Sequence, residues 1–189
     1  NYWANLGVDI FRLDAIPYLI KESGTNAENL PKTHSIIKVL SLYLQATAPR
    51  TVLQAEACQL PKDVIPYFGT ERKTETIIDD KTRDLKRTDE VQIAYNFPYM
   101  PALWASFITE DSKYFKDAVK QTPNIPESAS WATFLRVHDE LTLEMVTPEM
   151  RELIYQALEP KGAPFRKGFG VSGRMANFLD GNHDQIEMA

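Results

Sequence analysis

Carboxylates stand at the ends of three apolar segments of this chain. Residues 12–14 (Arg-Leu-Asp), 55–57 (Ala-Glu-Ala) and 136–140 (Arg-Val-His-Asp-Glu) close these segments. Because the carboxyl ends of parallel strands meet at one rim, where side chains with chemical roles gather, we expect these groups to face one another. The pattern predicts an active site built on carboxylates. Its candidate residues are Asp14, Glu56 and Asp139, with Arg12 and His138 beside them.

The first two carboxylates lie in unlike surroundings. Arg12 and Asp14 are two residues apart, so a strand places both on one face, where the cation lowers the pKa of Asp14. Glu56 lies in an apolar run with no cation next to it, and burial raises the pKa of such a carboxyl group. One ionised and one protonated carboxyl group can divide the roles of nucleophile and general acid. The structural alternatives are a plain Arg12–Asp14 ion pair and an edge position for Glu56.

The periodicity of apolar residues predicts the elements that position these groups. Four short apolar segments are typical of buried strands, and helices are predicted between them. Two segments, 71–89 and 159–173, are predicted as loops, the first because it is highly charged. The predicted strands are 6–15, 51–57, 91–97 and 131–137; the predicted helices are 33–46, 61–68, 100–109, 112–121 and 148–158, with helical tendency at 171–180 and 185–189.

The alternation of strands and helices predicts an α/β fold with a parallel sheet and right-handed crossovers. No glycine-rich phosphate-binding sequence follows a predicted strand, which disfavours dinucleotide binding. A complete (β/α)₈ barrel needs roughly 250 residues, whereas this chain has 189. Four predicted strands supply half of the eight that such a barrel contains.

The composition is that of a globular protein, with 43% hydrophobic and 25% charged residues and a net charge of −5. The negative charge disfavours nucleic acid as a partner. No apolar run approaches the roughly 18 residues of a membrane span, so no membrane partner is expected. Cys58, the one cysteine, cannot form an internal disulfide. Because the chain starts at Asn1 and soon enters a predicted strand, we expect an internal piece of a larger protein. The expected location is the cytoplasm.

Three motifs resemble strand signatures of the α-amylase superfamily (glycoside hydrolase family 13). Residues 7–15 (Gly-Val-Asp-Ile-Phe-Arg-Leu-Asp-Ala) resemble its fourth-strand signature, and residues 54–57 (Gln-Ala-Glu-Ala) its fifth-strand signature. Residues 134–140 (Phe-Leu-Arg-Val-His-Asp-Glu) resemble its seventh-strand signature. The three occur in the family's order with plausible spacing, so together they form a specific signal.

Further segments are similar to those of trehalose synthases within this family. They are residues 24–34, which follow the first motif, and residues 121–127 and 139–146. Amylosucrases share weaker versions of two of these segments. The resemblance runs from about Gly7 to the end of the chain and is poorest in the charged segment 71–89.

The resemblance implies a role for each matching residue. Asp14 would be the nucleophile that forms a covalent glucosyl intermediate, and Glu56 the general acid and then base. Asp139 would stabilise the oxocarbenium-like transition state. Two carboxyl groups in these roles are expected about 5 Å apart in a retaining enzyme. The implied substrate-binding residues are Arg12, which would hold Asp14 ionised and oriented, and His138 and Arg174.

The implied activity is the isomerisation of maltose to trehalose by glucosyl transfer within a closed pocket, with small α-glucosides as substrates. An α-amylase or α-glucosidase hydrolase and an amylosucrase-like transferase remain alternatives. Val137, which stands where trehalose synthases usually have Asn, weakens the subgroup assignment more than the chemistry. An inert half-barrel is the alternative outside enzymes. A sugar-binding protein on a degenerate barrel is disfavoured because all three carboxylates are present.

The chemistry implied by the resemblance requires no cofactor, although some trehalose synthase sequences suggest a structural Ca²⁺ site. The ligands that the resemblance implies are the backbone carbonyls of Tyr18 and Leu19 and a nearby glutamate, for which Glu22 is the candidate here. Lys21 stands where the pattern has a carboxylate, and a cation at a ligand position argues against Ca²⁺.

The predicted architecture is therefore a partial (β/α)₈ barrel. Residues 1–189 would form its C-terminal part, roughly strands four to seven with their helices, without the first three strands and the eighth. Such a piece has two open sheet edges, and we expect it to self-associate and to be inactive alone.

Overall fold

The computed structural model describes residues 2–135 and 140–188, which divide into two compact units. The first unit contains the chain up to Tyr95 together with Asn124–Ala132, and the second contains Asn96–Pro123 and the chain from Thr133 onward. Each unit has its own hydrophobic core.

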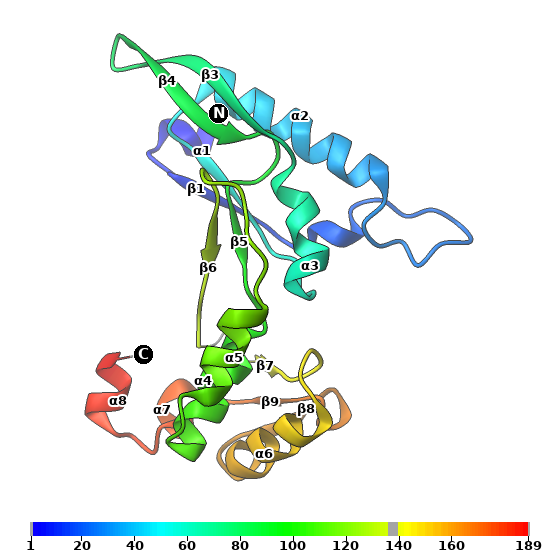
Figure 1. Cartoon of the computed structure of the whole chain (residues 1–189), viewed down its shortest axis with the longest axis vertical. Helices are drawn as coiled ribbons and strands as arrows, with labels where there is room; N and C mark the ends of the chain where they lie inside the picture. The colour runs from blue at the N-terminus through cyan, green and yellow to red at the C-terminus, as the bar shows by residue number, and fades with distance from the viewer. Residues whose placement is uncertain (1, 136–139, 189) are drawn as a thin grey trace. The chain divides into compact units, whose positions relative to one another are not determined.

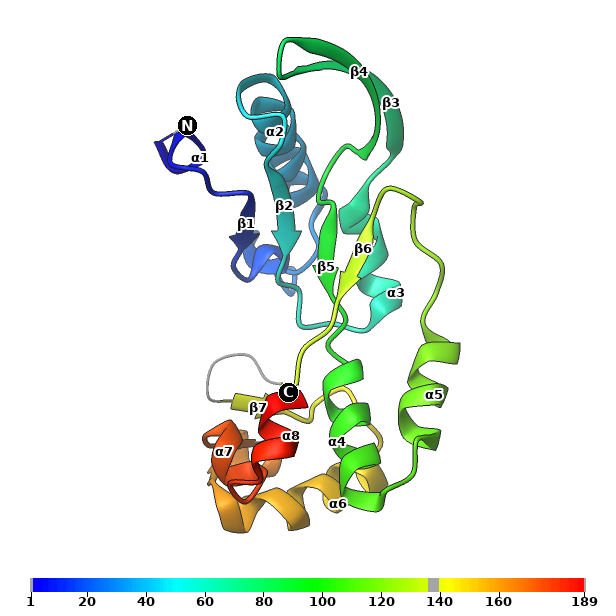
Figure 2. The same ribbon diagram turned by 90° about the vertical axis from the view of Figure 1, so that its left-hand side faces the viewer.

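The first unit is built on a four-stranded parallel sheet in the order β1-β2-β5-β6, and its strands are arranged in the order in which they occur along the chain. Figure 2 shows these strands side by side. The predicted parallel sheet is confirmed, although each strand is shorter than its apolar segment. The elements of this unit are α1 Tyr2–Asn5, β1 Ile10–Leu13, η1 Ile16–Tyr18, α2 Pro31–Thr47, β2 Val52–Ala55, α3 Pro61–Val64, η2 Ile65–Phe68, β3 Glu71–Ile78, β4 Lys81–Thr88, β5 Ile93–Tyr95 and β6 Ser130–Ala132.

Helix α2 forms where the periodicity predicts a helix, and it lies alongside the sheet (Figure 1). Pro31 occupies its first turn, where the missing N–H costs nothing, and Pro49 follows soon after its last residue. Ile37, Ser41 and Leu44 recur at helical spacing and form its buried face. The core includes Ile37 and Leu44 from this helix, Leu53, Ala55 and Ala94 from the sheet, and Val64, Tyr67 and Phe68 from α3 and η2.

The prediction of a loop over 71–89 is wrong, because this segment forms the antiparallel hairpin β3–β4. Asp79 and Asp80 make its two-residue turn, and both have positive φ angles, 53° and 57°. A turn with two such residues matches the twist of a hairpin. The charges that suggested a solvated loop are partly paired in the hairpin: Lys86 Nζ lies 3.2 Å from Glu71 Oε1 and Arg72 Nε lies 3.2 Å from Asp89 Oδ2.

The second unit combines helices with a three-stranded antiparallel sheet of order β7-β9-β8. Thr147 caps α6 as predicted, since its hydroxyl accepts a hydrogen bond from Met150 N at 3.3 Å. Buried residues of α4, α6 and the sheet, among them Trp104, Ile154 and Val171, form the core. The elements are α4 Tyr99–Thr109, α5 Lys113–Gln121, β7 Glu140–Thr142, α6 Pro148–Leu158, η3 Glu159–Lys161, β8 Ala163–Phe165, η4 Arg166–Gly168, β9 Gly170–Ser172, α7 Met175–Phe178 and α8 His183–Met188.

The sequence expectations for the last third of the chain are only partly met. Helices α4, α5 and α6 are confirmed, whereas 159–173, expected as a loop, contains β8 and β9. Within the expected span 171–180, only Met175–Phe178 is helical, because the first residues of the span belong to β9. The expected strand 131–137 is reduced to β6 at Ser130–Ala132, and residues 136–139 lie outside the described part of the chain.

Among residues 2–135 and 140–188, every helix is too short or too polar to cross a lipid bilayer.

Candidate functional site

Two of the predicted carboxylates lie at the carboxyl ends of adjacent parallel strands. Strands β1 and β2 pair in register, with Arg12 opposite Gln54, and Glu56 N donates to Leu13 O at 3.0 Å just beyond the strands. Because side chains alternate along a strand, Arg12, Asp14 and Glu56 share the face of the sheet opposite the helices. The other face carries the residues that pack in the core, Phe11, Leu13, Leu53 and Ala55.

Arg12 lies between the two carboxylates. Its Nη1 lies 3.3 Å from Asp14 Oδ1, and its Nη2 lies 2.5 Å from Glu56 Oε1. The fork of the guanidinium thus contacts both carboxylates at once. The expectation that Glu56 has no neighbouring cation is wrong, because the adjacent strand supplies one that is 44 positions away in sequence. The sequence could have predicted this contact, because Arg12 and Glu56 were both expected at the same rim of the sheet.

The two carboxylates differ in exposure, as their sequence surroundings suggest. The side chain of Asp14 is 77% exposed and that of Glu56 only 17%. Burial is the largest cause that raises the pKa of Glu56, and hydrogen bonding with Asp14 and the negative charge of Asp14 add to it. Arg12 and the backbone N–H of Ala15 act in the opposite direction without reversing the shift. The predicted direction of the pKa shift of Glu56 is confirmed, and a raised pKa is the property that a general acid needs.

Two further features mark this corner of the first unit. Glu56 Oε2 is buried and makes no hydrogen bond of ordinary geometry to a described residue. Ala15, directly after Asp14, has φ 46° and ψ 40°, a left-handed conformation that is uncommon for a residue with a side chain. Strained backbone of this kind clusters at functional sites. The strain at Ala15 therefore points to the same corner as the two carboxylates.

The roles of three further predicted site residues stay predictions. His138 and Asp139 lie outside the described residues. Arg174 is the N-cap of α7 in the second unit, so its proximity to the carboxylates of the first unit stays a prediction. The distance expected between Asp14 and Glu56 also stays a prediction.

The side chains of two candidate calcium ligands, Tyr18 and Glu22, contact other residues. Tyr18 Oη donates to Glu28 Oε1 at 2.5 Å, and Lys21 Nζ lies 5.1 Å from the centre of the Tyr18 ring. Glu22 Oε2 lies 3.7 Å from Lys32 Nζ. The described residues contain no group of three or more His, Cys, Asp or Glu side chains arranged to hold a metal ion.

No model of a known protein family matches the chain. Its sequence is 42% identical to "Trehalose synthase/amylase TreS" of Mycobacterium tuberculosis (strain CDC 1551 / Oshkosh) over 188 residues, which covers 100% of this chain. It is 41% identical to "Trehalose synthase" of Thermus thermophilus over 188 residues, or 99% of this chain. The chain spans 29% of the length of the first relative and 18% of the second.

The fold resembles that of sucrose 6F-phosphate phosphorylase from Thermoanaerobacter thermosaccharolyticum. The TM-score is 0.67 at 18% identity, over 96% of this chain and 35% of that one. At this identity the likeness concerns the fold, a mixed α/β architecture with a parallel sheet. The sequence identity to trehalose synthases extends along the whole chain, and the chain belongs to the α-amylase superfamily, glycoside hydrolase family 13.

Proposed function

We propose that this chain carries the nucleophile and the general acid of a retaining enzyme that isomerises maltose to trehalose. The observation that carries this proposal is the Arg12 guanidinium, which lies 3.3 Å from the exposed carboxylate of Asp14 and 2.5 Å from the half-buried carboxylate of Glu56. Asp14 is open to a substrate, and Glu56 has a raised pKa. The relatives named trehalose synthase support the choice of substrate.

The first half of the reaction breaks the glycosidic bond of maltose. Asp14 Oδ attacks the anomeric carbon, while Glu56 gives its proton to the glycosidic oxygen that leaves with the second glucose. The products of this step are a glucosyl ester on Asp14 and an ionised Glu56. Arg12 stabilises Asp14 before the attack and Glu56 after it, because it contacts both carboxylates.

The second half reverses the proton transfer on a different hydroxyl. The released glucose turns within the site, and Glu56 takes the proton from its anomeric hydroxyl as that oxygen attacks the glucosyl ester. Asp14 leaves, and the product is trehalose. Water that enters in place of the glucose gives two glucose molecules, so the site must exclude it. In this proposal Asp139 stabilises the transition state, and His138 and Arg174 bind sugar hydroxyls, as the family resemblance implies.

The proposal includes the architecture. The four parallel strands support an assignment as strands four to seven of a (β/α)₈ barrel, with residues 1–189 as its C-terminal part. The face that carries Arg12, Asp14 and Glu56 would then be the barrel interior. The exposed β1 edge and exposed apolar residues of α2, such as Val39 and Leu42, support the idea that further chain or a second copy covers them.

The test is product analysis on the longest polypeptide that contains this chain and, in parallel, on the chain alone. Each is incubated with maltose, and the sugars are separated by chromatography. Trehalose as the main product supports the proposal. Glucose without trehalose would indicate a hydrolase instead. The M. tuberculosis relative, whose name includes both trehalose synthase and amylase, favours this alternative. No turnover of maltose or sucrose by the longer polypeptide would contradict both.

A further inference from the structure

A cavity of about 330 Å³ lies between α2 and the β3–β4 hairpin of the first unit. It belongs to the helix-covered side of the sheet, whereas Arg12, Asp14 and Glu56 share the opposite face. Three of its lining side chains are cations and one is a carboxylate, in a chain whose net charge is −5. The lining residues are Lys38, Leu42, Gln45, Arg72, Thr74, Arg87 and Asp89.

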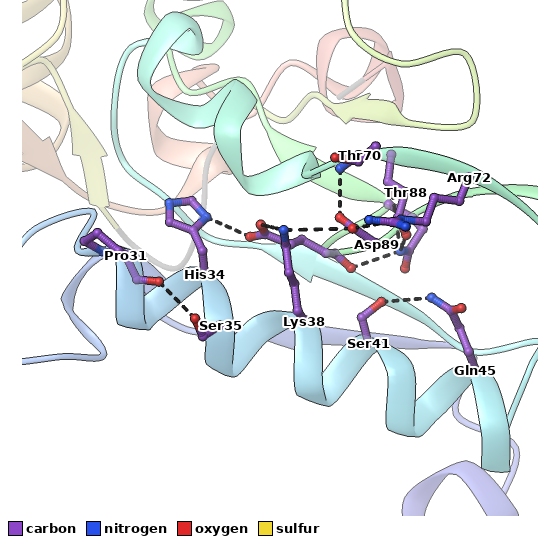
Figure 3. Close-up of polar contacts among 12 residues, drawn as sticks. Pro31, His34, Ser35, Lys38, Ser41, Gln45, Thr70, Arg72, Thr88 and Asp89 are labelled. Atoms are coloured by element: carbon purple, nitrogen blue, oxygen red, sulfur yellow. Dashed lines mark hydrogen bonds and ion pairs between the residues drawn. The ribbon is translucent and has the colours of Figure 1, made fainter.

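Two of the cations keep donors available. Figure 3 shows Lys38 reaching from α2 toward Asp89, with Arg72 on the hairpin beside the same carboxylate. Lys38 Nζ lies 3.9 Å from Asp89 Oδ2 and 3.7 Å from Glu90 Oε1, both beyond hydrogen-bond distance. Arg72 uses Nε for Asp89, and its two Nη groups make no hydrogen bond to a residue that the structure describes. Both side chains are partly exposed and can turn toward a ligand.

The carboxylates nearby are already engaged. Asp89 accepts from Thr70 N at 2.8 Å through Oδ1 and from Arg72 through Oδ2. Glu90 Oε2 lies 2.8 Å from His34 Nδ1 and its side chain is 3% exposed, and Glu90 is not among the residues that line the cavity. Asp89 repels an anion in the cavity, but Lys38 and Arg72 both lie within 4 Å of its carboxylate and offset that charge.

The third cation is buried without a counter-charge. Arg87 is 8% exposed, and its Nη groups donate to neutral acceptors, Pro49 O, Thr51 O and Gln92 Oε1. No carboxylate of the described residues forms an ion pair with it, and its buried Nε has no hydrogen-bond partner among them. Burial lowers the pKa of this guanidinium. A buried cation of this kind is costly, and a negative ligand nearby would lower that cost.

We infer that the cavity between α2 and the hairpin binds a phosphate group, either inorganic phosphate or a phosphate monoester of a small molecule. Two available cationic donors and the charge of Arg87 suit a compact anion, and arginine forks match phosphate oxygens. The volume suits a small ligand and excludes a folded macromolecule. Thr74 and Gln45 provide polar groups at the wall, and Leu42 an apolar one, against which the rest of a monoester would lie.

Isothermal titration of the full chain with inorganic phosphate, and separately with glucose 6-phosphate, tests this inference. Both titrations are run at constant ionic strength set with chloride. We expect saturable binding of one equivalent with a Kd of about 1 mM or tighter, and a loss of at least about tenfold in the variants Lys38→Gln and Arg72→Gln. Equal affinities would identify the free anion as the ligand, and tighter binding of glucose 6-phosphate a monoester.

The matched control is Lys73→Gln, which removes a cation next to Arg72 on the same strand but outside the cavity lining. It should bind phosphate like the parent chain. Circular dichroism checks that each variant is folded, which is expected because the side chains of Lys38 and Arg72 are partly exposed. The inference is overturned if neither phosphate compound binds saturably, or if Lys38→Gln and Arg72→Gln bind as well as Lys73→Gln does.

Discussion

The two charged clusters of the first unit contain the same kinds of side chain in opposite proportions. On one face of the sheet, one cation, Arg12, contacts two carboxylates. On the helix side, the cavity has three cations and the single carboxylate of Asp89. The first cluster leaves a carboxyl group with a raised pKa, and the second leaves a buried guanidinium without a counter-charge. The ratio of charges and the depth of burial thus decide the chemistry that each cluster can perform.

The largest expected effect concerns the carboxylate-rich cluster. Asp14→Asn should lower turnover of maltose by roughly 10³-fold or more, because no group of similar strength replaces the nucleophile. Turnover is measured on the longest polypeptide that contains the chain. Asp9→Asn, one residue before the start of the same strand, is the matched control and should leave turnover near its normal value.

The variant Glu56→Gln distinguishes the role of general acid from that of nucleophile. Its turnover of maltose should be severely reduced. It should still form the glucosyl ester from α-glucosyl fluoride, because fluoride leaves without a proton. Asp14→Asn should be inactive on both substrates. Equal activity of Asp14→Asn and Asp9→Asn on maltose would rule out Asp14 as the nucleophile.

Replacing the buried cation of the second cluster should change stability. Arg87→Met keeps much of the apolar stem but leaves Pro49 O and Thr51 O without their donor, so we expect a loss of about 1–3 kcal/mol in the free energy of unfolding. Urea denaturation measures this change. If Arg87→Met is instead more stable than the parent chain, the missing counter-charge dominates over the lost hydrogen bonds.

The raised pKa of Glu56 predicts a dependence of stability on pH. A carboxyl group with a higher pKa in the folded state binds more protons there than in the unfolded chain. The free energy of unfolding should therefore fall as pH rises from the ordinary range of carboxyl groups through the raised pKa of Glu56. Urea denaturation across this pH range should show the decrease in the parent chain and a smaller one in Glu56→Gln.

The pKa of Glu56 itself can be measured in variants of the two residues beside it, Arg12 and Asp14. Arg12→Gln should raise the pKa of Glu56 further, because it removes a cation that favours the ionised form. Asp14→Asn should lower the pKa, because it removes a negative charge. Carbon-13 NMR of the Glu56 carboxyl group as a function of pH measures both shifts. An unchanged titration midpoint in both variants would contradict the bridging role of Arg12.

The smallest effect is expected at the hairpin that carries Arg72 and Arg87. Asp80→Gly places glycine at a left-handed turn position, where φ is 57°, and should raise the free energy of unfolding by about 0.5–1 kcal/mol. Thermal unfolding measures it. A decrease in stability would show that the Asp80 side chain contributes more to the turn than its backbone strain removes.

Features of the fold that depend on residues close together in sequence were predictable, and features that depend on distant pairing were not. Helix α2 and the Thr147 cap of α6 were predictable because helical spacing and capping depend on neighbours within a few residues. The hairpin was missed because its pairing joins residues 71–78 to 81–88 across a turn without glycine, and its alternation is obscured by charges. The sheet β7-β9-β8 was missed for a related reason, since three-residue strands carry too little periodicity to be recognised.

The amino-acid sequence by itself determined the residue types at the strand ends, the shared face of Arg12 and Asp14, and the family, since motifs and side-chain alternation are local properties. Only the tertiary structure decided that Arg12 also reaches Glu56, and that Arg87 is buried without a carboxylate partner. Both facts depend on which strand or helix lies beside which. Distant pairing fixes those neighbours, and with them the local charge balance and burial that set the pKa of Glu56.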